Sequence, residues 1–182
     1  MSAGRVVCVT GMPGCGKEEL LQVAAELGFR VVRMGDVVRE EAARRGLALT
    51  DAAVGGMADE ERKRHHPGVW AERTLPRVGP GAFLVDGIRA QSEVTLFREG
   101  LGDRVTVVSV DASPRTRYER VRLRRRPDDI QSFEAFEVRD RRELVWGLGE
   151  VIAGADHHLA NEGSLEEFRA ASRALLAKLT GA

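Results

Sequence analysis

The sequence is poor in cysteine and has no long apolar run, and each shortage excludes a class of protein. Only two of its 182 residues are cysteines, Cys8 and Cys15, and they form no Cys-x-x-Cys pair. A disulfide framework or a cysteine-based zinc site is therefore not expected, and a reducing compartment fits this usage. No run approaches the length of a membrane span, and the N-terminal residues lack the hydrophobic region of a signal peptide. We expect a soluble cytoplasmic protein that needs no membrane.

The sequence also lacks an excess of charge of either sign. It contains 28 Lys and Arg residues against 28 Asp and Glu residues, so its formal net charge at pH 7 is zero. A general nucleic-acid or membrane surface needs a positive balance, so neither partner is expected. Lysine occurs only at Lys17, Lys63 and Lys178, and most of the many arginines are interpreted as solvated surface residues. Nothing in the pattern indicates a particular oligomeric state.

Short apolar runs alternate with helical patterns along the chain. Strands are expected at residues 5–10, 29–34, 82–86, 104–110 and 157–160. Helices are expected at residues 17–27, 36–45, 50–64, 69–78, 91–99, 113–125, 132–151 and 164–179. This alternation predicts an α/β fold in which helices cover both faces of a parallel sheet. No repeat or linker interrupts it, so residues 1–182 are predicted to form a single domain.

The first expected strand leads into a glycine-rich stretch that ends in lysine, Gly11-Met12-Pro13-Gly14-Cys15-Gly16-Lys17. Between a strand and a helix, Gly-x-x-x-x-Gly-Lys is typical of a phosphate site. Glycines let successive N–H groups converge at the positive end of the helix, and Lys17 adds a mobile ammonium. We predict nucleotide phosphate binding; the alternative is a glycine-rich turn that binds nothing. Glu18 stands where Ser or Thr usually offers a hydroxyl to Mg²⁺.

Two further strand ends carry charged residues, Gly35-Asp36-Val37-Val38-Arg39 and Asp86-Gly87-Ile88-Arg89. In a parallel sheet, ligands gather at the carboxyl ends of the strands. Asp86, on a buried strand beside the phosphate loop, is predicted to hold Mg²⁺ directly or through water; a hydrogen bond to the loop backbone is the alternative. The guanidinium groups of Arg39 and Arg89 are predicted to converge on an acceptor phosphate, since the forked group suits that anion. For each taken singly, a surface salt bridge is the alternative.

A cationic cluster follows the fourth strand and its helix, with positive charges at Arg122, Arg124, Arg125 and Arg126. Like charges so close together destabilise a helix unless an anion neutralises them. Arg122 and Arg126 are therefore predicted to stabilise charge on a phosphoryl group during its transfer, and Asp128 and Asp129 to help close a lid. Three more cations follow at Arg139, Arg141 and Arg142. One of them is expected to reach the phosphates, and the spacing does not choose among them.

These segments resemble adenylate kinases and other nucleoside monophosphate kinases, through Gly-Asp-x-x-Arg, Asp-Gly-x-Arg and the arginine-rich stretch with Asp-Asp. They are still more similar to a group of small archaeal proteins described as nucleotide kinases related to CMP and AMP kinases. The shared segments are Val9–Gly14, Met34–Glu41, Asp86–Arg89 and Asn161–Glu167. The segment Ala155–Asn161 also resembles, more weakly, a segment of dephospho-coenzyme A kinases.

The resemblance implies a P-loop three-layer sandwich with a five-stranded parallel sheet in the order 2-3-1-4-5. It also implies an acceptor arm at about residues 36–78, a lid at about 122–142, and ATP and Mg²⁺ as cofactors. The implied nucleotide-binding residues are Gly11, Met12, Pro13, Gly14, Cys15, Gly16, Lys17 and Glu18, with Asn161 near the ATP base. The implied acceptor-binding residues are Gly35, Asp36, Arg39, Asp86, Gly87 and Arg89. Lys17 and Arg89, with Arg122 and Arg126, are the predicted catalytic cations.

Departures from the adenylate kinase pattern leave the acceptor open. Glu18 and Glu19 replace Gly-Thr after the loop lysine, the Asp-Gly-Phe-Pro-Arg segment is one residue shorter here, and Glu93 replaces a glutamine that would read an acceptor adenine. The carboxylates of both glutamates interact favourably with the positive end of the helix dipole. They are expected to point away from bound phosphate. We predict an Mg²⁺-ATP-dependent kinase for a nucleoside monophosphate or similar small phosphorylated acceptor. The alternatives are a regulatory nucleotide-binding module without turnover, slow ATP hydrolysis coupled to a protein partner, and a dephospho-coenzyme A kinase-like enzyme.

Overall fold

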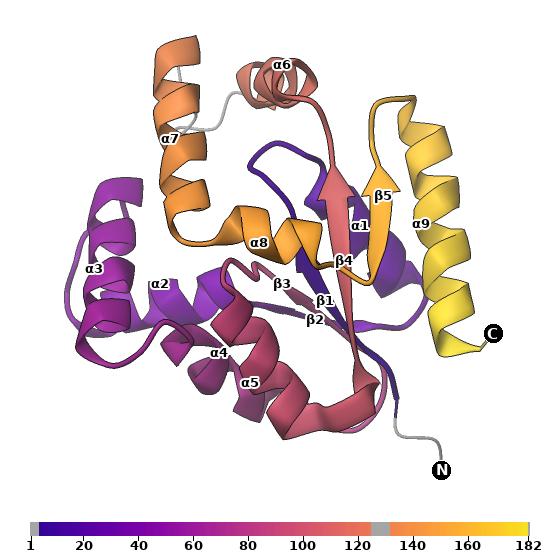
Figure 1. The fold of residues 1–182 in the computed structure, drawn as a ribbon, viewed down its shortest axis with the longest axis horizontal. Helices are drawn as coiled ribbons and strands as arrows, with labels where there is room; N and C mark the ends of the chain where they lie inside the picture. Colours follow the sequence, from indigo (N-terminus) through magenta and orange to yellow (C-terminus); the bar gives the residue numbers. More distant parts are fainter. Residues whose placement is uncertain (1–3, 125–131, 182) are drawn as a thin grey trace.

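The structure is a computed structural model of the chain and describes residues 4–124 and 132–181. Five strands form one sheet in the order β2-β3-β1-β4-β5, and all neighbouring strands are parallel (Figure 1). The strands are β1 (Val6–Thr10), β2 (Arg30–Arg33), β3 (Phe83–Asp86), β4 (Val105–Asp111) and β5 (His157–Ala160). The α/β fold and the strand order implied by the resemblance are therefore confirmed.

Helices cover both faces of this sheet, which gives three layers (Figure 1). One face carries α1 (Lys17–Glu26) and α9 (Leu165–Thr180). The other face carries α2 (Met34–Arg44), α3 (Asp51–Arg64), α4 (Val69–Thr74), α5 (Gln91–Leu101) and α8 (Leu148–Ala153). Beyond the carboxyl end of the sheet lie α6 (Pro114–Arg124) and α7 (Phe133–Val145). Short 3₁₀ helices occupy Leu75–Arg77 and Gly102–Arg104.

Strand β1 is the centre of the core, and all five of its side chains are buried. Val6 and Cys8 pack against the layer that contains α5, whereas Val7 and Val9 pack against α1, as the alternation of a strand requires. Burial raises the pKa of the Cys8 thiol to about 12, so this cysteine is a packing residue rather than a nucleophile. Both cysteines are free thiols, as expected. This rigid strand fixes the start of the glycine-rich loop.

Two expected element boundaries are wrong, each for a local reason. The helical pattern at 132–151 is two helices, because Gly147 adopts a φ of 97° that ends α7 and lets α8 start in a new direction. Helix α2 begins at Met34, at the very end of β2, so Met34 and Gly35 lie in its first turn rather than before it. The predicted capping box of the last helix is confirmed, since Ser164 and Glu167 bond each other's backbone N–H groups.

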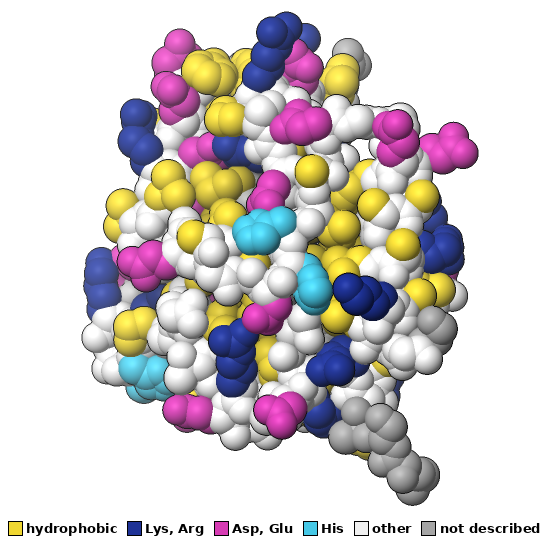
Figure 2. Space-filling model, turned by 45° about the vertical axis from the view of Figure 1, so that its right-hand side comes forward, with side chains coloured by type: hydrophobic (Ala, Val, Ile, Leu, Met, Phe, Trp, Pro, Cys, Tyr) yellow, Lys and Arg dark blue, Asp and Glu magenta, His cyan; other side chains and the backbone are white. Residues whose placement is uncertain are grey.

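The surface carries both signs of charge. In the view of Figure 2, acidic and basic side chains are interspersed among apolar ones, and neither sign forms a continuous region. Within the part of the chain that the structure describes, no helix combines the length and the apolarity that a membrane span requires.

Candidate functional site

A cleft of ≈ 710 Å³ lies at the carboxyl ends of β1, β2 and β3, where the sequence predicts ligand binding. Most of the predicted site residues share its wall. They are Gly11, Pro13, Gly14, Gly16, Lys17, Glu18, Gly35, Arg39, Asp86, Gly87, Arg89 and Asn161. Residues that the sequence analysis did not assign also line it: Glu19, Arg33, Ile88, Arg120, Val121, Glu143, Leu148 and Leu165. Arg139 lines the cleft as well.

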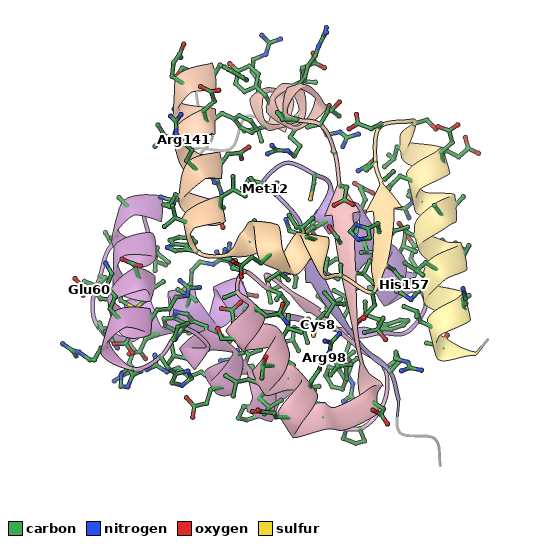
Figure 3. All side chains as sticks on the ribbon, viewed as in Figure 1. Cys8, Met12, Glu60, Arg98, Arg141 and His157 are labelled. Atoms are coloured by element: carbon green, nitrogen blue, oxygen red, sulfur yellow. The ribbon has the colours of Figure 1, made fainter. Side chains whose placement is uncertain are left out.

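The phosphate loop, Gly11–Lys17, is packed closely against the elements behind it. A Cβ on Gly16 would lie 2.2 Å from Nδ2 of Asn161, and one on Gly14 would lie 2.7 Å from the carbonyl oxygen of Arg117. Both glycines also have positive φ, 100° and 82°. No larger residue fits at either position, so the loop keeps its curled path. Met12 lies in this loop beneath α6 in the view of Figure 3, but neither it nor the fully buried Cys15 is part of the cleft wall.

Helix α1 starts directly from this loop. Its N-cap, Gly16, has no side chain that could bond the first N–H groups, and the positive end of the helix favours an anion at this point. The Lys17 ammonium donates to the carbonyl oxygen of Gly11 at 2.5 Å and lies 3.6 Å from Sγ of Cys15. These contacts hold the ammonium beside the loop backbone, where it could bind the terminal phosphates of a nucleotide.

The two glutamates after the loop, Glu18 and Glu19, both line the cleft. Arginines from other elements hold both. Glu18 forms a forked pair with Arg33 at 2.8 and 2.9 Å, and Glu19 pairs with Arg169 of α9 at 2.9 Å. Because each carboxylate is neutralised, it opposes bound phosphate less than a lone glutamate would.

Asp86 ends β3 opposite Val9 of β1, so it lies beside the phosphate loop as predicted. Its Oδ1 atom is buried and has no hydrogen-bond partner among the described residues. A buried acceptor without a partner fits a ligand that supplies one, such as Mg²⁺ or a water of its shell. Within the described residues, no group of three or more His, Cys, Asp or Glu side chains could bind a metal by itself. The residues therefore fit a metal that phosphate oxygens help to hold.

The two predicted acceptor arginines lie on the same cleft but are each already ion-paired. Nε of Arg89 donates to Oε2 of Glu143 at 2.9 Å, and its Nη1 donates to the carbonyl oxygen of Gly87 at 3.2 Å. The buried Glu143 carboxylate raises the pKa of Arg89 above its ordinary value. Arg39 is exposed and bonds Asp36 at 2.7 Å; Asp36 itself is not part of the cleft wall.

Glu93 has a structural role at the position where the resemblance would place a base-reading glutamine. Its side chain is fully buried and accepts hydrogen bonds from the backbone N–H groups of Arg89 at 2.7 Å and Ala90 at 3.2 Å. Burial raises the pKa of this carboxyl, and Arg62 lies 3.5 Å away. Glu93 shapes the turn that presents Arg89 and does not face an acceptor.

Two arginines on α6 that the sequence analysis overlooked contact the back of the loop. Arg117 is buried, donates to the carbonyl oxygen of Pro13 at 3.1 Å, and pairs with Asp140 of α7 at 2.9 and 2.5 Å. Arg120 donates to Oδ1 of Asn161 at 3.2 Å. Their spacing of three residues, which places both on one helix face, is the signal that could have identified them.

Asn161 contacts the loop itself. The residue is 5% exposed, and its Nδ2 donates to the carbonyl oxygen of Cys15 at 2.8 Å. The resemblance implied a place near the ATP base, whereas the contacts of Asn161 are with the backbone of the phosphate loop and with Arg120.

One of the predicted catalytic cations, Arg122 of α6, does not lie where the prediction needs it. Arg122 does not line the cleft but a second hollow, with Tyr118 and Phe133. Two residues along a helix turn the side chain by about 200°, so Arg122 faces away from the loop that Arg120 contacts. Arg126, with the rest of 125–131, lies outside the described residues. Arg139 of α7 lines the cleft, whereas Arg141 is exposed on the outer side of α7 (Figure 3).

A central parallel sheet, a glycine-rich loop before α1 and a strand-end carboxylate define a P-loop protein with a kinase-like fold. Solved structures share this fold: TT1252 from Thermus thermophilus has a TM-score of 0.65 at 24% identity and covers 99% of this chain and 100% of its own. Shikimate kinase from Acinetobacter baumannii, in complex with shikimate, has a TM-score of 0.64 at 17% identity and covers 98% and 94%. At these identities the likeness concerns the fold alone.

Sequence comparison gives the family. A family model described as an AAA domain matches residues 10–137. The UPF0200 protein of Hyperthermus butylicus is 48% identical over 179 residues, which cover 97% of this chain and 95% of that protein. The chain therefore belongs to the UPF0200 proteins, a family with this P-loop domain. The predicted kinship with small archaeal P-loop proteins is confirmed.

Proposed function

We propose that the protein is an Mg²⁺-ATP-dependent kinase that transfers the γ-phosphoryl group to a small phosphorylated acceptor such as a nucleoside monophosphate. The observation that carries the proposal is that the phosphate loop and the two strand-end arginines, Arg39 and Arg89, line one cleft. A cleft of ≈ 710 Å³ is within the usual size range for a small-molecule site. Phosphoryl transfer needs mainly positioning and charge neutralisation, which these residues can supply without a covalent nucleophile.

Each part of the cleft has a role in this proposal. The loop amides and Lys17 bind the β- and γ-phosphates, and Asp86 holds Mg²⁺ directly or through water. When bound, the metal neutralises developing charge on the phosphate oxygens. Arg39 and Arg89 orient the acceptor anion. Residues of about 36–78 and 122–142 act as acceptor arm and lid of a single domain, and nucleic acid is not a substrate.

The test is an acceptor screen with purified protein, ATP and Mg²⁺. The panel includes nucleoside monophosphates and dephospho-coenzyme A, and it includes shikimate because a structural neighbour binds it. We expect ADP formation that depends on one acceptor and is lost in Lys17→Ala. Lys63→Ala is the matched control, since that lysine is exposed and pairs with Asp59 of its own helix. ADP formation no faster than in Lys17→Ala, with every acceptor, would refute the proposal.

One observation favours a second candidate, a regulatory nucleotide-binding module without turnover. Both acceptor arginines are already neutralised by carboxylates of the protein, Arg89 by Glu143 and Arg39 by Asp36. Such a module would bind ATP tightly and bind no acceptor, and Arg89→Ala would leave its ATP affinity unchanged. Equilibrium titration with ATP, followed by titration with the acceptor panel, separates the two candidates, because only the kinase would bind an acceptor.

A further inference from the structure

One face of α7 contacts three parts of the molecule that are far apart in the sequence. Asp140, Glu143 and Trp146 follow each other at intervals of three residues, so they lie on neighbouring positions of one helix face at the end of α7. Figure 1 shows α7 running from the side of α6 down toward α3 and α8. Its side chains contact Arg117, which bonds the phosphate loop, and Arg89, which lies at the acceptor end of the proposed site.

The first contact leads to the phosphate loop. Asp140 forms a two-point ion pair with Arg117, at 2.9 and 2.5 Å, and the Arg117 side chain is only 4% exposed. The same guanidinium group donates to the carbonyl oxygen of Pro13 at 3.1 Å. The packing of Phe136 beneath this guanidinium, 5.0 Å from its centre to that of the ring, fixes its position further. The loop backbone and α7 are thus joined through one side chain, Arg117, which is held at several points.

The second contact leads to the acceptor end. The Glu143 side chain is 5% exposed, and its Oε2 accepts from Nε of Arg89 at 2.9 Å. Because Gly87 accepts from Nη1, the guanidinium group is held at two points and its plane is fixed in the cleft. The Glu143 carboxylate is the buried partner of this pair. Removal of Arg89 would therefore destabilise the protein more than removal of one partner of an exposed pair, because the remaining carboxylate stays desolvated.

The third contact leads to α3. The guanidinium of Arg62 lies over the Trp146 ring at 5.1 Å, and Arg142 lies over the same ring at 5.4 Å. Arg62 also lies 3.5 Å from the buried Glu93, whose side chain shapes the turn before Arg89. Trp146 is half-buried, so its surroundings report on how α7 sits against α3.

We propose that Glu143 is a positioning residue that orients Arg89, and that α7 couples occupation of the phosphate loop to the acceptor end through Asp140 and Glu143. The proposal rests on the proposed function, since it requires a nucleotide on the loop. It follows from the geometry because two ion pairs, each with one buried partner, lie about one helical turn apart on a single helix. By linkage, nucleotide and acceptor affect each other's affinity by the same factor, and coupling of this kind is usually about 5- to 150-fold.

The test uses the intact protein, a non-hydrolysable ATP analogue with Mg²⁺, and the fluorescence of Trp146. Trp70 is fully buried, so acrylamide quenching reports chiefly on Trp146. In the wild type we expect the analogue to reduce this quenching. In Glu143→Gln the analogue should still bind, within about tenfold of wild type, but should no longer protect Trp146. Glu137→Gln is the matched control, because this exposed carboxylate lies on the same helix, and it should behave as wild type.

Arg89→Gln removes the same ion pair from the other side and provides the result if Glu143→Gln does not fold. If the analogue binds both proteins and protects Trp146 equally in the wild type and in a folded Glu143→Gln or Arg89→Gln variant, the coupling alone is overturned. Failure of the analogue to bind the wild type would overturn the proposed function and the coupling together. Loss of protection in Glu137→Gln as well would show a general loosening of α7 and would also contradict the role of Glu143.

Discussion

Replacement of Asn161 by alanine is the most informative perturbation of the phosphate loop. The side chain joins two parts of the site: Nδ2 donates to the carbonyl oxygen of Cys15 at 2.8 Å, and Oδ1 accepts from Arg120 at 3.2 Å. The backbone N–H of Asn161 donates to the carbonyl oxygen of Asp111 at 2.8 Å. This bond does not involve the side chain, so the substitution should leave the end of β5 paired with β4. Asn161→Ala therefore removes the link between β5 and the loop while it leaves the sheet intact.

The magnitude follows from these contacts. A lost hydrogen bond costs about 0.5–1.5 kcal/mol, and a buried carbonyl left without a donor costs about 1–3 kcal/mol. Arg120 reaches the same carbonyl oxygen of Cys15 only at 3.5 Å, which is too long to replace the lost bond. The Arg120 guanidinium lines the cleft and can bond water instead of Asn161. Its lost hydrogen bond therefore adds little to the loss of stability. We expect the free energy of unfolding to fall by about 2 kcal/mol.

The same substitution should weaken nucleotide binding, because the loop then has to be ordered at the moment the phosphates bind. We expect an affinity about tenfold lower for an Mg²⁺–ATP analogue, equivalent to about 1.4 kcal/mol. Urea unfolding and isothermal titration calorimetry measure the two effects separately. Gln22→Ala, an exposed amide on α1, is the control. If Asn161→Ala lost stability and still bound the analogue as wild type does, the claim that Asn161 preorganises the loop would be refuted.

Other substitutions test single statements about the cleft. Arg139→Ala is expected to lower kcat/KM about tenfold or more, because this guanidinium lines the cleft, whereas Arg122→Ala should leave it unchanged; equal losses in the two would contradict the corrected assignment. Glu18→Ser should keep ATP affinity within about tenfold of wild type, since the ion pair with Arg33 that it breaks is partly exposed. A larger change in a binding titration would mean that Glu18 takes part in nucleotide binding. Burial alone would raise the pKa of Glu61, but Arg73 and Arg45 outweigh it and lower the pKa. The stabilisation by the ionised Glu61 carboxylate is therefore fully present above its ordinary pKa of 4.5 and is lost as pH falls through the lowered pKa. Glu61→Gln should accordingly flatten the fall of stability at acid pH, measured by thermal unfolding. An unchanged acid limb would show that the pair contributes nothing.

The features that sequence reasoning predicted correctly are those written in local patterns. The glycine-rich loop between β1 and α1, the position of Asp86 at a strand end and the capping box at Ser164 each depend on a few adjacent residues. The order of the strands came from the resemblance rather than from any spacing. The break at Gly147 was missed because a single glycine within a charged helical pattern is compatible with a continuous helix until its φ is known.

The ion pairs of the cleft could not be predicted, since their partners come from distant segments. Glu18 pairs with a residue of β2, Arg89 with a residue of α7, and Arg117 with another residue of α7. A charge pattern predicts which element presents a cation, but not whether a carboxylate from elsewhere already neutralises it. Crowding of like charges along one helix, as at Arg122 and Arg124, says nothing about carboxylates on other elements.

That distinction decides which cations remain for a phosphoryl group. Arg33, Arg39 and Arg89 each have a protein carboxylate. Arg139 also lines the cleft, its Nε is buried without a hydrogen-bond partner, and it forms no ion pair within residues 4–124 and 132–181. A buried guanidinium nitrogen without an acceptor is costly, and an anion that enters the cleft relieves that cost. A phosphoryl group that gains charge during transfer would gain most from such a cation, because no carboxylate of the described residues would have to be displaced first.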